Sequence, residues 1–297
     1  MSNIGLIIEE RAADIGNFMV GRLLPFKQKR SVGPFVFIDH MGPANLKDYQ
    51  NVDVDVHPHI GLSTLTYLFE GAIQHKDSVG SDIVIEPGAV NWMTAGSAVT
   101  HSERTPEYLR NSDKSLHGLQ IWVALPKHLE ECEPSFHHIE QKDIPQWKEN
   151  NFEIKLIAGE AFGKKSPVPV HSKLYFIEIK TQTGAKLSIG KDLYGESALY
   201  ILNGAIVDDG IRYEPKQILV AKDTKLCEFE MEPETTVYIF GGEPFEEQRY
   251  IFWNFVSSDA NRIEKAKQDW IARNFPKVPN DDTYVPLPDY LVDKKPI

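Results

Sequence analysis

Two pairs of potential metal ligands occur in the first half of the chain, each with the spacing of alternate residues on a β-strand. The first pair is His57 and His59, and the second is His101 and Glu103. Because alternate side chains of a strand point to the same face, each pair offers two ligands together. Three imidazoles and one carboxylate suit a divalent first-row metal ion, and this set without a thiolate favours iron(II). A single His-x-His is common by chance, but two such pairs in strand-like sequence predict a metal site.

Short β-strands must position these ligands. Runs rich in β-branched and aromatic residues recur along the chain and are separated by Gly, Pro, Asn and Asp. This pattern predicts a sandwich or barrel, and the absence of strand–helix alternation argues against a parallel α/β sheet. Pro58 lies between the first two ligands and has no amide donor, so we expect its strand at a sheet edge or near an opening. The clearest expected strands span residues 35–38, 63–69, 83–85, 118–124, 174–179 and 236–240.

An internal repeat divides the chain. Residues 67–73 reappear as 200–206, with tyrosine, glycine, alanine and isoleucine in register, and a Glu-Pro pair recurs at nearly the same distance downstream in each copy. A period of about 130 residues exceeds that of solenoid repeats and indicates two copies of a whole β domain. The expected domains are 1–130, 131–258 and a C-terminal segment, 259–297.

The second copy lacks the ligand residues. The repeat offsets carry the four ligand positions to Gly190, Asp192, Phe229 and Met231, which cannot reproduce three imidazoles and a carboxylate. We therefore expect one metal ion per chain, in the first half. The second half would serve as a structural partner or a binding surface.

The connecting and C-terminal segments carry weaker signals. Residues 127–155 are predicted to form a linker because they contain proline and clustered charge, and residues 159–171 are predicted to form a loop. Asp259 is expected to cap the one substantial helix. The proline-rich tail beyond Pro276 is expected either to clamp across the surface or to stay mobile. The helix residues at helical spacing are Ile263, Ala266, Lys267, Trp270, Ile271 and Phe275.

A few further residues are candidates for supporting roles. His40 ends a strand just before the metal segment, which makes it a candidate for a contact that orients a ligand. Val90, Trp92 and Met93 are candidates for the pocket wall, with ordinary core packing as the alternative for each. Surface or hydrogen-bonded core positions are expected for the other histidines, His75, His117, His128, His137, His138 and His171.

Composition narrows the classes of function. The formal net charge of −11 argues against non-specific binding to nucleic acid, which requires a basic surface. Cys132 and Cys227 form no disulfide framework or Cys-x-x-Cys site, which favours a reducing, cytoplasmic compartment. The first residues do not resemble a signal peptide, and no run reaches the ~20 apolar residues of a membrane span. We also find no serine-hydrolase elbow, phosphate-binding loop or dinucleotide fingerprint.

Ordered motifs over roughly the first 125 residues, with matching layout beyond them, resemble those of the pirin family. The motifs are Gly33-Pro-Phe-Val-Phe-Ile-Asp-His-Met-Gly-Pro43, His57-Pro-His-Ile-Gly61, Thr66-Tyr-Leu-Phe-Glu-Gly71, His75-Lys-Asp-Ser78, Pro87-Gly88, Asn91-Trp-Met-Thr-Ala-Gly96 and His101-Ser-Glu103. The resemblance implies an all-β fold of two tandem cupin (jelly-roll-like) β-barrel domains, followed here by a C-terminal helix and an extended tail. It also implies iron(II) on the four predicted ligands and a second domain without metal. Many pirins carry Arg-Gly-Phe-Glu after His-Pro-His; this chain has Ile60-Gly-Leu-Ser63, which removes a charge pair expected beside the site and affects substrate preference.

The resemblance implies two kinds of activity. The first is that of quercetin 2,3-dioxygenase, with an aromatic small-molecule substrate, dioxygen and Glu103 as the expected catalytic base. The alternative is a non-enzymatic, metal- or redox-dependent regulator that binds a transcription factor or a metabolic enzyme. A third possibility is a cupin isomerase or storage-like protein with a structural ion. Mn, Ni, Co, Cu or Zn also suit the ligands, and no direct nucleic-acid or membrane partner is expected.

Overall fold

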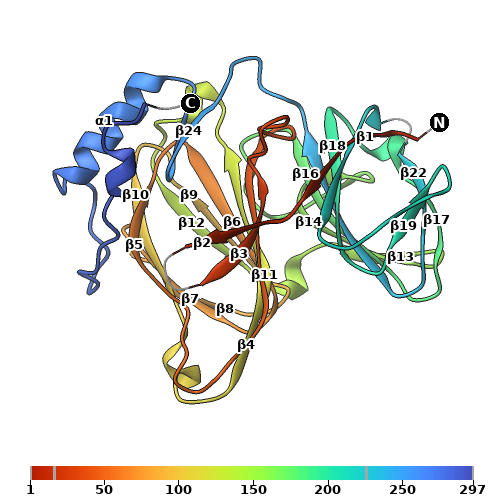
Figure 1. The fold of residues 1–297 in the computed structure, drawn as a ribbon, viewed down its shortest axis with the longest axis horizontal. Helices are drawn as coiled ribbons and strands as arrows, with labels where there is room; N and C mark the ends of the chain where they lie inside the picture. The colour runs from red at the N-terminus through yellow and green to blue at the C-terminus, as the bar shows by residue number, and fades with distance from the viewer. Residues whose placement is uncertain (1, 16–17, 225–226, 296–297) are drawn as a thin grey trace. The chain divides into compact units, whose positions relative to one another are not determined.

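The structure is a computed structural model that describes residues 2–15, 18–224 and 227–295 (Figure 1). It consists mainly of antiparallel β-strands, so the expected all-β class is confirmed. The chain forms two compact units. The unit called here the first barrel contains residues 12–21, 39–138 and 246–297, and the second barrel contains residues 1–11, 22–38 and 139–245.

The first barrel has a smaller sheet and a larger one. The smaller sheet, in spatial order, is β5 (Asp53–His59), β10 (Val99–Arg104), β7 (Ile73–Asp77) and β8 (Asp82–Ile85). The larger sheet is β12 (Ser135–Ile139), β9 (Val90–Thr94), β6 (Leu62–Glu70), β11 (Lys114–Ala124), β4 (Phe35–Leu46), β3 (Met19–Leu24) and β2 (Arg11–Asp14). Strands β4, β3 and β2 each cross the division between the two units, with residues 35–38, 22–24 and 11 counted in the second. Because β5 is the edge strand of the smaller sheet, the expectation drawn from Pro58 is confirmed.

The second barrel repeats this strand order. Its smaller sheet is β17 (Ala185–Ser188), β22 (Glu228–Met231), β19 (Ile206–Asp208) and β20 (Ile211–Tyr213). Its larger sheet is β1 (Ile4–Glu9), β21 (Gln217–Ala221), β18 (Glu196–Asn203), β23 (Thr235–Gly242), β16 (Leu174–Thr181), β14 (Phe152–Ala161) and β13 (Gln146–Glu149), with β15 (Lys164–Lys165) paired to β14. The duplication inferred from the repeat is therefore visible strand by strand.

The units are not the contiguous segments that the repeat suggested. The N-terminal strand β1 pairs with β21 and completes the larger sheet of the second barrel. In the first barrel the corresponding edge position belongs to β12, which pairs with β9. The predicted linker at 127–155 is thus wrong, because β12 and β13 both lie within it. The predicted loop at 159–171 likewise begins inside β14 and contains β15.

The other sequence-based expectations of secondary structure fare better. Each of the six expected strands lies within an observed strand. Short 3-10 helices occupy turns at Glu107–Leu109, Lys127–Leu129, Gln141–Asp143, Gly190–Asp192 and Asp289–Leu291. The free thiols of both cysteines agree with the expected absence of a disulfide.

The C-terminal segment packs on the first barrel. It forms the hairpin β24 (Tyr250–Phe252) and β25 (Phe255–Ser257), then α1 (Ala260–Ile271). The Asp259 carboxylate caps α1 as predicted, accepting a hydrogen bond from the Asn261 amide at 2.9 Å. Ile271 is 45% exposed, so its predicted place in the buried stripe is wrong. The 12-residue α1 is too short to cross a bilayer, and no other described helix is long and apolar enough.

Candidate metal centre

The strand pairing of β5 and β10 brings three of the four predicted ligands together. His57 lies directly opposite His101 in the antiparallel register, and His59 lies opposite Val99. The ring nitrogens that His57, His59 and His101 can offer all lie within 4.8 Å of one another. The Nε2 atoms of His59 and His101 are 3.0 Å apart. The alternation of side chains along the two strands therefore produces a compact imidazole cluster, as the sequence predicted.

Glu103 lies beside this cluster and shares one member with it. The Glu103 carboxylate forms a second group of potential ligands with His101 and His75, again within 4.8 Å. His75 comes from β7, where it lies directly opposite Glu103 in the register with β10. The Thr66 hydroxyl donates a hydrogen bond of 3.5 Å to the Glu103 carboxylate. The structure thus groups three of the four predicted residues in one cluster and places Glu103 in a second group that shares His101 and adds His75.

Burial keeps the three imidazoles neutral. His59 and His101 are each 1% exposed and His57 is 8% exposed. Burial in apolar surroundings lowers the pKa of His57 to about 4. It also lowers the pKa of His59 and of His101 well below the usual value, with a further contribution from the neighbouring histidines. Neutral imidazole is the form that binds a metal ion, so the cluster is ready to do so at neutral pH.

Backbone hydrogen bonds select the tautomer of the β5 ligands. His57 Nδ1 donates to the carbonyl of Asp55 at 2.9 Å, and His59 Nδ1 donates to the carbonyl of Asn254 at 3.0 Å. A neutral imidazole carries one proton, so Nε2 of each ring remains free to bind a metal ion. The Asn254 contact was not visible in the sequence, because that residue lies in the distant turn between β24 and β25.

A chain of three side chains orients His101. The buried Asp77 carboxylate accepts a hydrogen bond from His75 Nε2 at 2.9 Å. His75 Nδ1 then lies 3.4 Å from His101 Nδ1 and is placed to accept its proton. Burial opposes ionisation of Asp77, but hydrogen bonds from His75 and Ser81 outweigh it, so its pKa is lowered. Asp77 and His75 thus leave Nε2 of His101 available, in the manner of a carboxylate–histidine–metal triad.

The larger sheet provides the wall opposite the ligands. Trp122 of β11 packs edge-on against His59, with ring centroids 5.1 Å apart, and Phe136 of β12 stacks on His75 at 4.5 Å. Met93 lies opposite Thr64 in the register and belongs to the inward face, as predicted. Trp92 alternates with Met93 and donates to Thr94 on the opposite face, so the alternative of ordinary core packing applies to it.

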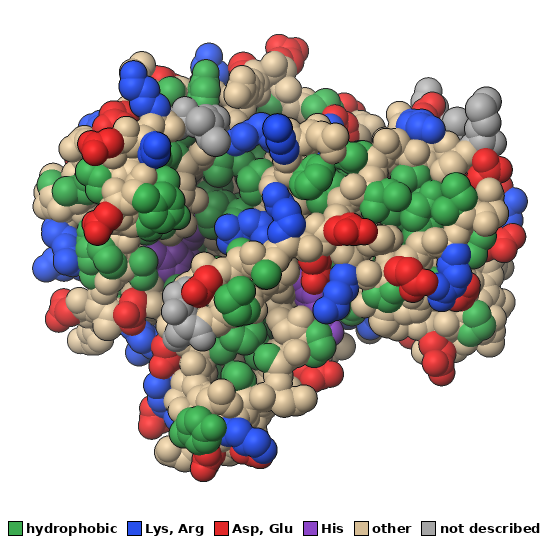
Figure 2. Space-filling view, viewed as in Figure 1, with side chains coloured by type: hydrophobic (Ala, Val, Ile, Leu, Met, Phe, Trp, Pro, Cys, Tyr) green, Lys and Arg blue, Asp and Glu red, His purple; other side chains and the backbone are tan. Residues whose placement is uncertain are grey.

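Val90 shares the face of β9 that points away from the ligands, so the alternative of core packing applies to it as well. Figure 2 shows histidine side chains in a recess that hydrophobic side chains border.

Several residues that the sequence analysis singled out contact groups other than the candidate ligands. His40 Nε2 lies 2.8 Å from His117 Nε2, and these two histidines form a pair of their own. Ile60 packs with the apolar cluster of the C-terminal segment, and the Ser63 hydroxyl lies 3.1 Å from that of Thr94. The departure from the charged residues of many pirins therefore does not alter the side chains that face the ligands. His137 is exposed, as expected.

The C-terminal tail covers the outer side of β5. The Val56 amide donates to the Thr283 hydroxyl at 3.2 Å, and the Val285 amide donates to the Val56 carbonyl at 2.9 Å. The indole of Trp270 donates to the Val285 carbonyl at 3.1 Å and ties this segment to α1. The tail therefore clamps across the surface, which was one of the two expected outcomes.

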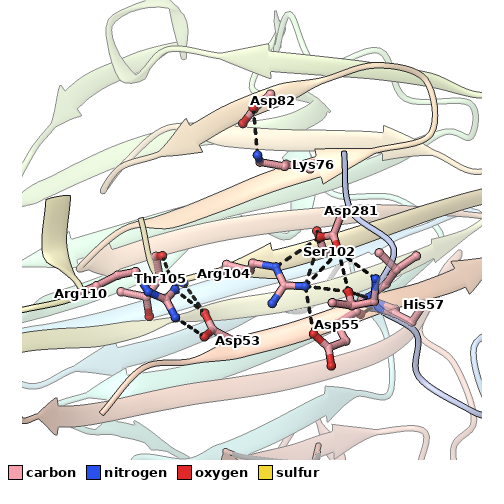
Figure 3. A network of polar contacts seen from close by, with 12 residues as sticks. Asp53, Asp55, His57, Lys76, Asp82, Ser102, Arg104, Thr105, Arg110 and Asp281 are labelled. Carbon is pink, nitrogen blue, oxygen red and sulfur yellow. Dashed lines mark hydrogen bonds and ion pairs between the residues drawn. The ribbon is translucent and has the colours of Figure 1, made fainter. Parts of the chain in front are cut away.

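The same tail holds the outer side of β10 (Figure 3). The Ser102 hydroxyl donates to the Asp281 carboxylate at 2.8 Å, and Arg104 forms an ion pair with the same carboxylate at 3.1 Å. The Thr100 hydroxyl donates to the Pro276 carbonyl at 2.7 Å. These outward residues alternate along β10 with the inward His101 and Glu103. We call residues 276–285 the strap.

The second barrel has apolar residues at the corresponding positions. Strand pairing sets Leu187 opposite Phe229, as His57 is opposite His101, and sets Ile206 opposite Met231, as His75 is opposite Glu103. The Ile189 amide bonds to the Cys227 carbonyl at the position where β5 has His59.

The sequence offsets therefore identified Phe229 and Met231 correctly as the counterparts of His101 and Glu103. They were wrong in assigning Gly190 and Asp192 as the counterparts of His57 and His59, because these two residues lie in a 3-10 helix after β17. No cluster of three metal-binding side chains occurs among the described residues of the second barrel.

Comparison with known proteins agrees with these features. Residues 17–123 match the pirin family model, and residues 176–276 match the model of the pirin C-terminal cupin domain. A pirin-like protein of Caulobacter vibrioides is 47% identical, with 96% of this chain and 100% of that protein covered. Human pirin is 26% identical, with 90% and 91% covered.

A crystal structure of quercetin 2,3-dioxygenase from Acinetobacter baumannii superimposes with a TM-score of 0.85. It is 32% identical, and 96% of each chain is covered. The chain thus belongs to the pirin family, and its two barrels are cupin domains.

Proposed function

We propose that this chain is a mononuclear iron(II) dioxygenase that cleaves quercetin-like flavonols. The observation that carries the proposal is the cluster of three buried, neutral imidazoles beside a carboxylate. The similarity over almost the whole chain to a quercetin 2,3-dioxygenase supports this substrate class.

The chain's own residues fit a metal ion. Nε2 of His57, His59 and His101 would hold it, because the Nδ1 atoms are already engaged. Glu103 would complete the set with one oxygen. When bound, the ion would bind the flavonol and dioxygen and stabilise negative charge that develops on oxygen. Four protein ligands leave up to about two positions of an octahedral ion for these partners.

Glu103 is the residue we assign as base for the flavonol hydroxyl. Burial raises the pKa of its carboxyl, and this effect exceeds the opposing influence of His75 and of the Thr66 hydroxyl. A carboxylate with a raised proton affinity accepts a substrate proton more readily. The amide oxygen of Gln120, 2.9 Å from the Thr66 hydroxyl, competes with the Glu103 carboxylate at 3.5 Å for the single hydroxyl proton.

The wall opposite the ligands suits a flat aromatic substrate. Trp122 and Phe136 present ring surfaces next to His59 and His75, and aromatic rings favour offset or edge contacts with other rings. Met93 adds a flexible apolar contact on the same face. These side chains would also exclude water from the reacting atoms.

The test is turnover of quercetin by protein loaded anaerobically with iron(II) and then exposed to air. Wild type should consume dioxygen and release carbon monoxide together with the ring-opened ester. His59→Ala should lose at least about 100-fold in kcat/KM, whereas His137→Ala, a change at an exposed histidine, should retain full activity. Parallel loading with manganese, cobalt or nickel should give lower rates than iron.

The proposal is wrong if fully loaded wild type forms no product, or if His59→Ala turns over as fast as wild type. Loaded protein that binds metal tightly but forms no product would instead favour the regulatory alternative. That alternative predicts a protein partner that discriminates iron(II) from iron(III), which a pull-down with each oxidation state measures.

A further inference from the structure

The second barrel contains an apolar cavity at the place that corresponds to the metal centre. The space between its walls, including the mouth, is about 430 Å³. Ile189, Ile206 and Phe229 line it, and the strand registers place these residues where the first barrel has His59, His75 and His101. The ligand positions have thus become the walls of a hydrophobic pocket.

The rest of the lining is apolar except at one end. Leu193, Leu199, Leu219 and Ile239 extend the hydrophobic wall from the neighbouring strands. The polar groups come from Asn3, Ser197, Asp208, Cys227 and Glu228. Pockets with a mostly hydrophobic lining and a few polar groups are typical small-molecule sites.

The polar end is fixed by contacts within the second barrel. The Asp208 carboxylate accepts from the Ser2 hydroxyl and, at 3.2 Å, from the Asn3 amide. Ser197 is only 3% exposed, so its hydroxyl lies in the interior. Burial raises the pKa of the Cys227 thiol to about 11, so the thiol is neutral at physiological pH. The Asp208 carboxylate disfavours an anion, whereas the Glu228 carboxylate is exposed and forms an ion pair with Lys186 at 2.6 Å.

We propose that the second barrel binds a compact, uncharged, one-ring molecule with a single hydroxyl group, such as a phenol. The ring would fill the apolar part of the cavity, between Ile189, Ile206 and Phe229. The hydroxyl would reach the polar end, where Ser197 and Asp208 offer oxygen acceptors. The 430 Å³ includes open solvent at the mouth, so the enclosed space is much smaller, which favours one ring over a three-ring flavonol.

Titration of metal-free protein with phenol tests the proposal by calorimetry. We expect one saturable site with a dissociation constant on the order of 0.1–1 mM, a reasonable affinity for so small a ligand. Benzoate should bind at least about tenfold more weakly because of its charge. Leu219→Trp, which fills the cavity, should weaken phenol binding at least about tenfold. The matched control Ile211→Trp, at a residue that is 53% exposed, should have no effect.

A second measurement locates the ligand in wild-type protein, so that the proposal remains testable if Leu219→Trp fails to fold. In spectra of protein with labelled isoleucine methyl groups, phenol should shift Ile189, Ile206 and Ile239. Ile263, which packs in the first barrel, should not move. Absence of saturable binding, equal affinity for benzoate, or shifts confined to Ile263 would overturn the proposal. His57→Ala should leave phenol binding unchanged, and loss of binding in that variant would place the ligand in the first barrel instead.

Discussion

Replacing Asp281 by alanine should loosen the metal centre although Asp281 touches no predicted ligand. Asp281 is the residue of the strap that holds the outward side chains of β10. Ser102 is fully buried, and its hydroxyl would lose the acceptor at 2.8 Å, which costs about 1–3 kcal/mol. Arg104 is 23% exposed and keeps its ion pair with Asp55 at 2.9 Å, so loss of its second partner adds about 1 kcal/mol at most. We expect the free energy of unfolding of the first barrel to fall by about 1–4 kcal/mol.

The effect on metal affinity follows from strand alternation. Ser102 lies between His101 and Glu103, so movement of β10 away from the strap displaces both inward side chains. Residues that orient metal ligands typically contribute a factor of about 10–100 to affinity. We therefore expect Asp281→Ala to bind cobalt(II) at least about tenfold more weakly than wild type. Competition with a chromophoric chelator measures this without requiring activity.

Asp113→Ala is the matched control. Asp113 also forms an ion pair, with Lys47 at 3.1 Å, but its side chain is 67% exposed. Its loss should change stability by about 0.5 kcal/mol or less and leave cobalt(II) affinity unchanged. Equal destabilisation by both variants, or wild-type affinity in Asp281→Ala, would refute the supporting role of the strap.

The destabilisation should also depend on pH. Burial alone would raise the pKa of Asp281, but hydrogen bonds from Thr283 and Ser102 and the charge of Arg104 outweigh it, so the pKa is lowered. A lowered pKa in the folded state means that this stabilisation is present above the unfolded value of about 3.9. It is lost as the pH falls through the folded-state value. The stability difference between wild type and Asp281→Ala, measured by urea unfolding, should therefore shrink below about pH 4.

Three further predictions concern the site and its supports. Asp77→Asn should weaken cobalt(II) binding about 10–100-fold by disturbing the proton position on His75, and equal affinity in wild type and variant would exclude this orienting chain. Elemental analysis of fully loaded protein should give one metal ion per chain, and two would contradict the apolar replacement in the second barrel. Gly61→Ala should destabilise the first barrel by at least about 2 kcal/mol, because φ is +67° and an added Cβ would lie 2.0 Å from the Val256 carbonyl oxygen. Gly163→Ala, at φ +65° with open space around it, controls for backbone strain alone, and equal effects of the two substitutions would show that the close contact is unimportant.

The parts of the site that sequence reasoning found depend on local geometry. His57 and His59, and likewise His101 and Glu103, are separated by one residue, so the pleat of a strand settles their common direction. Pro58 identified an edge strand because it lacks an amide proton. Both the common direction of each ligand pair and the edge position of the Pro58 strand can be inferred without knowledge of the strand pairing. The duplication was equally accessible, because two copies of one domain leave a repeat in the sequence.

His75 was missed because its role depends on strand pairing. It lies on β7, and only the pairing of β7 with β10 sets it opposite Glu103. A signal was nonetheless present, because His75 and Asp77 have the same alternate spacing as the two ligand pairs. The tail contacts could not be found in this way, since Asp281 and Ser102 are far apart in sequence and no periodic pattern links them.

The comparison of the two barrels shows why register is a better guide than sequence offset. An offset assumes that every connection has the same length in both copies, and it carried His57 and His59 to Gly190 and Asp192, beyond the end of β17. Strand pairing instead identifies Leu187 and Ile189, which alternate along one side of the smaller sheet as the histidines do. The positions of His57, His59, His75, His101 and Glu103 then have apolar counterparts, whereas Asp77 corresponds to Asp208. A barrel that had merely lost one ligand would keep several buried imidazoles with no ion to compensate for their desolvation. Replacement of all five ligand-type side chains removes that penalty, and it leaves a mostly apolar cavity at the corresponding place.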